Sequence, residues 1–350
     1  MKRYNNIFPK IVEMDNLRLA YRNARKGKSY YEEVKIIDEN PDYYLEQIQQ
    51  MLISGNYKTS EYVIFKKNDK GKEREIYKLP FYPDRIVHWA IMLQIEHIFM
   101  QTFTDFTNAS LKDRGIHRTL KQLDKALKDE NNTEYCLKID VKKFFPNINH
   151  DILKNLLRKK FKDKLLLELL DEIIDSVEGS KGVPIGNYLS QYFANFYLSY
   201  FDHWLKEEKK CKYVFRYMDD IVILDGDKNF LHNLKREIDE YLKVNLDLKV
   251  KENWQIFPTN VRGIDFVGYR VFRHYKLLRK STYKRMKEKC KKLVKQDSLS
   301  FSNFCTVNSY VGWLKWCNSY DLSLKYINPL LIKEFEKNPN SKKVIENARN

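Results

Sequence analysis

The chain has 350 residues, 43% of them hydrophobic, which suffices for two or three domains around a sizeable core. No apolar run approaches the roughly 20 residues that cross a bilayer and no signal segment follows Met1, so we expect a cytoplasmic protein without membrane contact. The net charge of +17 favours a nucleic-acid partner, because a basic surface attracts phosphate backbones; a compositional bias towards lysine is the alternative.

The first 130 residues are predicted to be mostly helical and to contain one β-hairpin. Helices are predicted at residues 16–26 and 41–54, each followed by a glycine that ends it, and again at 83–100 and 116–128. Apolar residues 62–65, a turn at 68–71 and residues 74–77 predict the hairpin. Its basic residues are Lys66, Lys67 and Arg74.

Three predicted strands in the middle of the chain carry carboxylates at their ends. Residues 135–139 form an apolar strand that ends at Asp140. Residues 213–216 and 221–224 form two further apolar strands, and they flank Asp219 and Asp220, which therefore lie at the tip of a hairpin. A leucine-rich helical pattern at 151–177 lies between these strands, and its apolar stripe is typical of a core-facing surface.

These carboxylates predict a metal site. Adjacent like charges between apolar strands repel each other unless a cation neutralises them, and oxygen ligands suit Mg²⁺. If Asp140 joins Asp219 and Asp220, the three carboxylates can hold two Mg²⁺ ions for nucleotidyl transfer. A lone Asp-Asp pair is more often a solvated turn, so the choice between a metal site and a turn depends on the surrounding sequence pattern.

Positive charge is concentrated towards the C-terminus. The segment 273–295 contains eleven Lys and Arg residues and one acidic residue, Glu288. Apolar residues are interleaved with them, as expected for a helix that buries one side and turns the other towards phosphates.

The order of the motifs resembles that of reverse transcriptases. An apolar strand ending in Asp140, a Gly-Val-Pro-Ile-Gly loop at 182–186 and Tyr-Met-Asp-Asp at 217–220 resemble motifs A, B and C of that family. The loop continues as Ile185-Gly186-Asn187 and Ser190-Gln191, which is similar to the enzymes of diversity-generating retroelements within the bacterial group II intron-like class. Group II intron enzymes typically have Gln at the position of Ile185 and Pro at that of Gln191. Residues 262–269 are similar to the palm-to-thumb motif.

The resemblance implies a role for each matching residue. Asp140 and Asp219 bridge two metal ions, Asp220 is a weaker ligand, and the carbonyl of Val141 completes one coordination sphere. Phe145 is the steric gate that excludes a 2′-hydroxyl, whereas Phe144 belongs to the core. Arg74 and Lys66 or Lys67 clamp the incoming triphosphate, and Ile185 and Gly186 contact the substrate. Trp254 stands near the position of the usual general-acid lysine, so Lys251 is only a candidate for that role.

The implied fold is an α+β right hand: N-terminal helices and fingers at 1–130, a palm with an interleaved fingers segment at 131–272, and a basic helical thumb at 273–350. The implied function is synthesis of adenine-mutagenised cDNA from a template-repeat RNA. The substrates would be an RNA template, a DNA or RNA primer and dNTPs, with two Mg²⁺ ions for which Mn²⁺ can substitute, and a small basic oligomeric accessory protein as partner. A related bacterial reverse transcriptase of antiviral defence and a catalytically inactive nucleic-acid-binding protein are the alternatives, and the intact aspartates argue against the latter.

Overall fold

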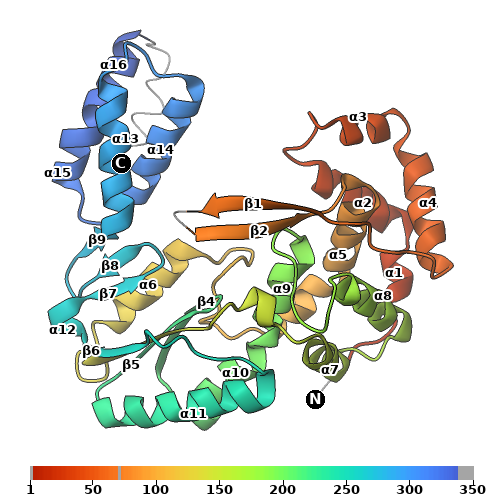
Figure 1. Cartoon of the computed structure of the whole chain (residues 1–350), viewed down its shortest axis with the longest axis horizontal. Coiled ribbons are helices and arrows are strands. Elements are labelled where there is room, and N and C mark those ends of the chain that lie inside the picture. The colour runs from red at the N-terminus through yellow and green to blue at the C-terminus, as the bar shows by residue number, and fades with distance from the viewer. Residues whose placement is uncertain (1–2, 70–71, 338–350) are drawn as a thin grey trace. The chain divides into compact units, whose positions relative to one another are not determined.

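The computed structural model describes residues 3–69 and 72–337, which form two compact units of mixed helix and strand (Figure 1). Unit 1 comprises Met1–Asp113, Ile139–Cys211 and Asn233–Trp254, and unit 2 comprises Arg114–Lys138, Lys212–His232 and Gln255–Asn350. Among the described residues, no helix combines the length and the apolar character that crossing a membrane requires.

Unit 1 is largely helical. Its helices are α1 (Phe8–Ile11), α2 (Met14–Arg25), α3 (Glu32–Glu39), α4 (Pro41–Ile53), α5 (Ile86–Thr102), α7 (His150–Lys160), α8 (Lys164–Asp175), α9 (Tyr188–Tyr197), α10 (Ser199–His203) and most of α11 (Lys228–Leu246). Short π-helical turns at Phe81–Arg85 and Trp204–Glu208 and a 3-10 turn at Phe145–Asn147 complete it. Helix α5 buries ten of its 17 residues and packs against α2 and α9, so it forms the centre of this unit.

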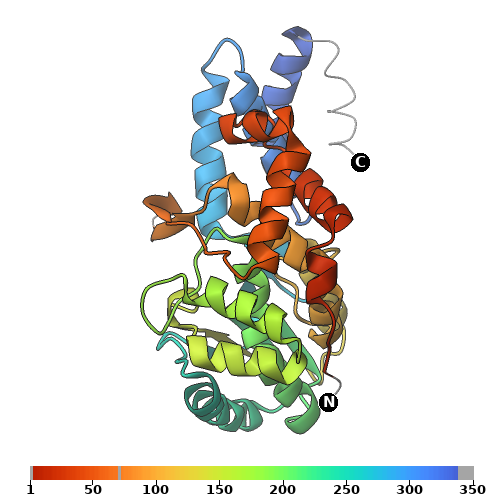
Figure 2. The ribbon, with the colours of Figure 1, turned by 90° about the vertical axis from the view of Figure 1, so that its right-hand side faces the viewer.

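The helical pattern predicted at 151–177 is confirmed as two helices, α7 and α8, which lie against each other (Figure 2). Asp163 separates them. One of its carboxylate oxygens accepts a hydrogen bond from the N–H of Leu166 and so caps α8, while the other accepts from the N–H groups of Ile7 (2.6 Å) and Phe8 (2.9 Å). A buried carboxylate with three donors fixes the break in the helix.

The predicted hairpin of unit 1 is confirmed as β1 (Val63–Asp69) and β2 (Lys72–Lys78), which pair antiparallel. Lys67 pairs with Arg74 and Lys66 with Glu75 across the two strands. The predicted turn at 68–71 lies partly outside the described residues. Val63, Ile64 and Phe65 are between 44% and 63% exposed, so unit 1 leaves much of the apolar surface of β1 uncovered.

The larger sheet has the strand order β4-β5-β3-β6. Its strands are β3 (Tyr135–Asp140), β4 (Tyr213–Tyr217), β5 (Asp220–Asp225) and β6 (Gln255–Pro258). Strands β4 and β5 form the predicted hairpin, and β3 pairs antiparallel with β6. The last two residues of β3, Ile139 and Asp140, are counted with unit 1.

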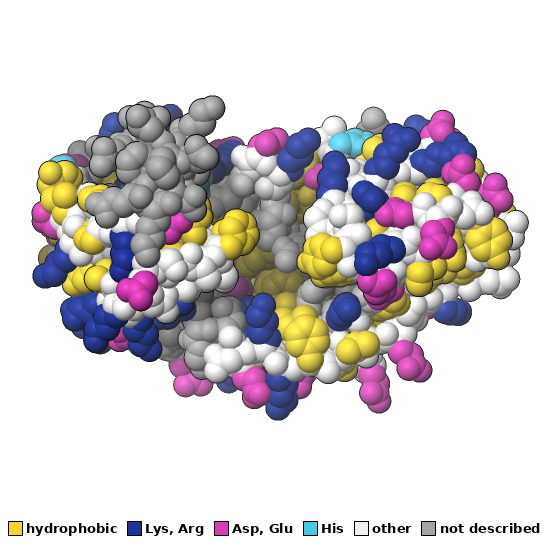
Figure 3. Space-filling model, turned by 90° about the horizontal axis from the view of Figure 1, so that it is seen from above, with side chains coloured by type: hydrophobic (Ala, Val, Ile, Leu, Met, Phe, Trp, Pro, Cys, Tyr) yellow, Lys and Arg dark blue, Asp and Glu magenta, His cyan; other side chains and the backbone are white. Residues whose placement is uncertain are grey.

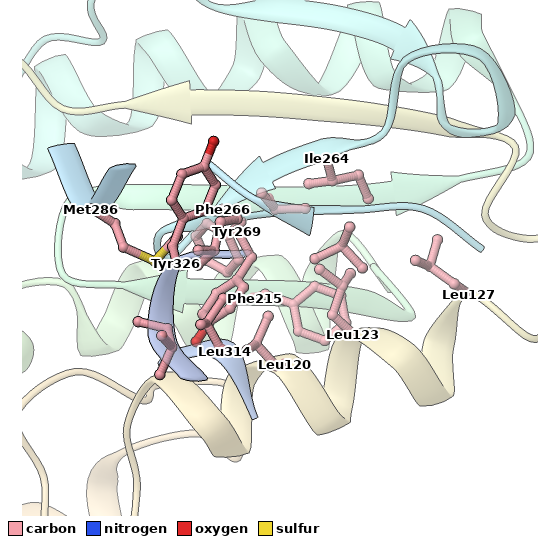
Figure 4. Close-up of a cluster of buried hydrophobic side chains, with 14 of the residues drawn as sticks. Leu120, Leu123, Leu127, Phe215, Ile264, Phe266, Tyr269, Met286, Leu314 and Tyr326 are labelled. Carbon is pink, nitrogen blue, oxygen red and sulfur yellow. The ribbon is translucent and has the colours of Figure 1, made fainter. Parts of the chain in front are cut away.

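The remaining elements of unit 2 form a small sheet and a helical end. They are α6 (Ile116–Ala126), α12 (Thr259–Arg262), β7 (Ile264–Phe266), β8 (Tyr269–Val271), β9 (Lys276–Leu278), α13 (Lys280–Val294), α14 (Phe301–Leu314), α15 (Tyr320–Leu322), a π-helical turn (Ser323–Ile327) and α16 (Asn328–Lys337). Apolar side chains of α6, β4, β7, β8 and α13 converge in one buried cluster, in which Leu123, Phe215 and Met286 lie (Figure 4). Burial of each such side chain stabilises the unit by about 1.5–3 kcal/mol.

The basic segment 273–295 is a strand followed by a helix, not one continuous helix. Strand β9 precedes α13, which buries Met286, Cys290 and Leu293 and exposes Lys284 and Lys291. Val294, an apolar residue of the predicted pattern, is 45% exposed. A group of Lys and Arg side chains is visible at the left-hand end of Figure 3, where Figure 1 has α13. The part of the predicted thumb beyond residue 337 lies outside the described residues.

Candidate active site

The turn between β4 and β5 presents the adjacent aspartates. Tyr217 pairs with Asp220 across the hairpin, so Met218 and Asp219 form the two-residue connection. Met218 has φ +56°, a conformation that a side chain with a Cβ rarely adopts, and such strain is common at functional sites. The fully buried guanidinium of Arg216 donates a hydrogen bond to the Met218 carbonyl (3.2 Å). A buried cation beside this turn favours the negative charges of the aspartates.

Arg216 is a residue that the sequence analysis missed. It is one of the largest fully buried side chains of the protein, and it lies in a strand that otherwise reads as apolar. A charged residue in the middle of a buried strand usually has a specific polar role, and that was the available signal.

Asp220 lies close to a lysine of the neighbouring strand. The Lys138 ammonium is 3.7 Å from the Asp220 Oδ1 atom, and both side chains are about one quarter exposed. Lys138 also donates a hydrogen bond to the backbone carbonyl of Asp265 in β7. The lysine is therefore shared between the acidic turn and the predicted palm-to-thumb motif.

Asp140 has a lysine partner of its own within unit 1. The Lys251 ammonium forms an ion pair with the Asp140 Oδ1 atom, and both side chains are about one third exposed. The Lys251 N–H also donates to the Asp140 carbonyl (2.8 Å), and Val141 pairs with Val250 in an antiparallel bridge. Trp254 instead packs against the Lys235 ammonium, which lies 4.5 Å from the ring centroid. Of the two positions considered in the sequence, Lys251 is the one that contacts a candidate metal ligand.

The loop at 182–186 is anchored beside the segment that follows Asp140. The Val183 N–H donates to the Phe145 carbonyl (3.1 Å), and the buried His150 ring binds the Gly182 carbonyl through Nε2 (2.7 Å). Phe144 is 2% exposed and belongs to the core, as predicted, whereas Phe145 is only half-buried. The two rings meet edge to face with centroids 5.7 Å apart.

The hairpin β1–β2 contacts this loop closely. The Tyr77 N–H donates to the Ile185 carbonyl (3.0 Å). Gly186 has φ +130°, and a Cβ atom there would lie 2.8 Å from the Tyr77 carbonyl oxygen. Only glycine fits this approach without strain.

A cavity of about 560 Å³ lies between the hairpin and the loop, within unit 1. Two of the three predicted triphosphate contacts, Lys66 and Arg74, line it together with Ile185, while Lys67 is not among its lining residues. Lys143 and Lys181, which the sequence analysis did not select, line it as well. Their proximity in sequence to Phe145 and to the 182–186 loop was the signal that could have identified them.

A second cavity, of about 240 Å³, also borders the hairpin and Gly186. Lys28, Lys78 and Arg85 supply its positive charge, and His88 lines it with a side chain that is 2% exposed. The His88 Nε2 atom has no hydrogen-bond partner among the described residues. Burial lowers the pKa of His88 to about 4, so its imidazole is neutral at pH 7.

Comparison with known proteins identifies the family. Residues 64–271, more than half of the chain, match the family described as reverse transcriptase (RNA-dependent DNA polymerase). The chain belongs to this family. Its α+β right-hand polymerase fold and the reverse transcriptase resemblance are thereby confirmed, while the narrower likeness to retroelement enzymes stays a prediction.

Similar proteins include two of bacterial origin. The chain is 25% identical over 221 residues to the group II intron-encoded protein LtrA of Lactococcus lactis, which covers 59% of this chain and 36% of that protein. It is 23% identical over 273 residues to the protein YkfC of Escherichia coli, with 65% and 71% covered. Apo telomerase from Candida Tropicalis is a similar solved structure, with 14% identity, a TM-score of 0.49, and 83% and 60% covered. The match to LtrA thus spans only about a third of that protein.

The family uses divalent metal ions, and the donor chemistry of this chain is compatible with them. Within residues 3–69 and 72–337, no three His, Cys, Asp or Glu side chains are grouped so that they could hold a metal ion unaided. Hard divalent cations are commonly bound by one or two carboxylates while waters and substrate phosphates supply the other ligands. Asp140 and Asp220 each have an ammonium group nearby, so a positive charge is already stabilised at both carboxylates.

Proposed function

We propose that this reverse transcriptase copies RNA into DNA with two Mg²⁺ ions held by Asp140, Asp219 and Asp220, with the Val141 carbonyl as a further ligand. The proposal is supported above all by the cavity between the basic hairpin and the 182–186 loop, because its size suits a nucleoside triphosphate and four basic side chains line it. When bound, the ions activate the primer 3′-hydroxyl and stabilise the leaving pyrophosphate.

The residues of this cavity would position the triphosphate. Arg74 has a planar guanidinium group, which can donate two parallel hydrogen bonds to phosphate oxygens. The ammonium groups of Lys66, Lys143 and Lys181 add positive charge around the cavity. Glu73, Glu75 and Glu178 also line the cavity and keep its charge from being purely positive. Because a hydrogen bond joins Tyr77 to Ile185, the hairpin and the loop would both contact the bound nucleotide.

The other substrate groups have counterparts in unit 1. The half-buried Phe145 ring would lie against the sugar and exclude a 2′-hydroxyl. The smaller cavity would receive a base of the RNA template, since unpaired bases stack on aromatic rings such as that of Tyr31. Lys28 and Lys78 would then neutralise the adjoining phosphates.

Primer extension tests the proposal directly. With a primed RNA template, dNTPs and Mg²⁺, the wild type should extend DNA, and Asp219→Asn or Asp140→Asn should abolish extension while template binding persists. Asp42→Asn is the matched control, because it neutralises an aspartate of unit 1 that is paired with Arg18 on the surface. Full extension by either active-site variant would contradict the metal assignment.

We further propose that the template is the repeat RNA of a diversity-generating retroelement and that the enzyme acts with a small basic oligomeric accessory protein. Ile185 supports this assignment, because it lines the nucleotide cavity with an apolar side chain that cannot donate or accept a hydrogen bond. Without a polar contact worth about 1 kcal/mol, discrimination against a mispair should fall several-fold.

Misincorporation opposite each template base tests this narrower proposal. Wild type and Ile185→Gln should be compared with the accessory protein and the structured RNA present, and the variant should make fewer errors at adenine. An unchanged error rate at adenine in a variant that still polymerises would exclude this role for Ile185. A low adenine error rate in the wild type would instead favour a role in antiviral defence.

A further inference from the structure

The contact between Lys251 and Asp140 is fixed by the backbone. The segment around Lys251 pairs with the end of β3 through the Lys251 N–H on the Asp140 carbonyl and the Lys142 N–H on the Lys249 carbonyl, both 2.8 Å. The bridge between Val141 and Val250 lies between these two hydrogen bonds. The backbone of Lys251 is therefore held beside Asp140, which restricts the positions that its ammonium group can take.

We propose that Lys251 is the resident counter-cation of Asp140, which it neutralises in the metal-free protein and from which a divalent ion must displace it. The inference rests on the proposed function only in taking Asp140 as a metal ligand. The Lys251 ammonium group is bound at the Oδ1 atom of Asp140, and its charge repels a divalent ion that approaches the same carboxylate. Metal binding at Asp140 is then an exchange of one cation for another.

The contact between Lys138 and Asp220 is looser than the contact between Lys251 and Asp140. The Lys138 ammonium is 3.7 Å from the Asp220 carboxylate and is also held by the Asp265 carbonyl, so it can stay in place when a metal ion arrives. Lys251 makes the direct contact and is the one that has to move. The two lysines should therefore affect metal binding unequally.

The exchange has a consequence for the order of binding. The protein alone should bind divalent ions weakly, because each ion first has to break the Lys251–Asp140 pair. A nucleoside triphosphate supplies further oxygen ligands for the ion and an anionic partner for the released ammonium. Metal ion and nucleotide should accordingly bind with positive coupling, and part of this coupling should depend on Lys251.

Direct measurement of Mn²⁺ binding tests the inference without using activity. Free Mn²⁺ is followed by electron paramagnetic resonance during titration of the full-length protein, without nucleic acid and with or without a nonhydrolysable dNTP analogue. Lys251→Met should bind Mn²⁺ roughly 1.5- to fivefold more tightly than the wild type, the range expected for removing a partly exposed competing ion pair. It should also unfold at lower temperature in EDTA.

Two controls separate the counter-cation role from general charge effects. Lys243→Met removes an exposed lysine that lines the same cavity as Lys251, and its Mn²⁺ affinity should stay close to that of the wild type. Lys251→Gln keeps a hydrogen-bond donor but not the charge, and it should also tighten Mn²⁺ binding. Equal tightening by the Lys243 and Lys251 variants, or no tightening by either Lys251 variant, would overturn the inference.

The Asp140→Asn variant separates the counter-cation role of Lys251 from the metal-ligand role of Asp140. If this variant loses Mn²⁺ affinity while the Lys251 variants behave like the wild type, Asp140 is a metal ligand and the counter-cation role is wrong. If Asp140→Asn binds Mn²⁺ as the wild type does, the metal assignment itself is wrong.

Discussion

Substitution of Gly186 by alanine should separate the hairpin from the loop that it contacts. The new Cβ would lie 2.8 Å from the Tyr77 carbonyl oxygen and 3.5 Å from the Ile76 Cγ2 atom, in a residue with φ +130°. A non-glycine residue in such a conformation costs about 1–3 kcal/mol, and loss of the Tyr77–Ile185 hydrogen bond costs about 1 kcal/mol more. The combined destabilisation should be about 2–4 kcal/mol.

Gly179→Ala is the control for this experiment. Gly179 also has a positive φ, of +95°, but a Cβ atom there would meet nothing within 4 Å. Urea unfolding should therefore show the smaller loss for Gly179→Ala, and kcat/KM for dNTP should fall by roughly tenfold or more only in Gly186→Ala. If the two variants lose the same stability and catalytic efficiency, the close approach of β2 to the loop does not position the nucleotide.

Three further predictions concern sugar selection, salt and pH. Phe145→Ala should admit ribonucleotides because it removes the ring that a 2′-hydroxyl strikes, and unchanged discrimination in rNTP incorporation assays would place the gate elsewhere. If the basic face of α13 makes about six phosphate contacts, template affinity should fall roughly a thousandfold between 50 and 200 mM salt, and a flat response in anisotropy titrations would exclude that face. The pKa of His88 is lowered from 6.5 to about 4, so between these values the unfolded chain binds a proton that the folded chain does not. Stability should therefore fall by up to about 3 kcal/mol as pH drops from 6.5 to 4, and an equal loss in His88→Leu by urea unfolding would refute this origin.

The elements that carry the candidate chemistry could be predicted from the sequence because their signals are local. The hairpin around Asp219 and Asp220 follows from two short apolar strands and a two-residue connection, and the strand before Asp140 follows from its apolar run. The basic hairpin with Arg74 was predicted in the same way. In each case the decisive residues lie within one strand or one hairpin, so periodicity and turn chemistry suffice.

Contacts between distant residues were decided by tertiary structure alone. The pairing of Asp140 with Lys251 and the approach of Gly186 to Tyr77 each join segments about a hundred residues apart, and no local pattern encodes such distances. The burial of Arg216 likewise depends on what packs around β4. The sequence alone predicted which carboxylates would bind the metal ions. The packing within each unit decided which cations lie beside those carboxylates, because a lysine or arginine is placed by the backbone that carries it and by its neighbours in space.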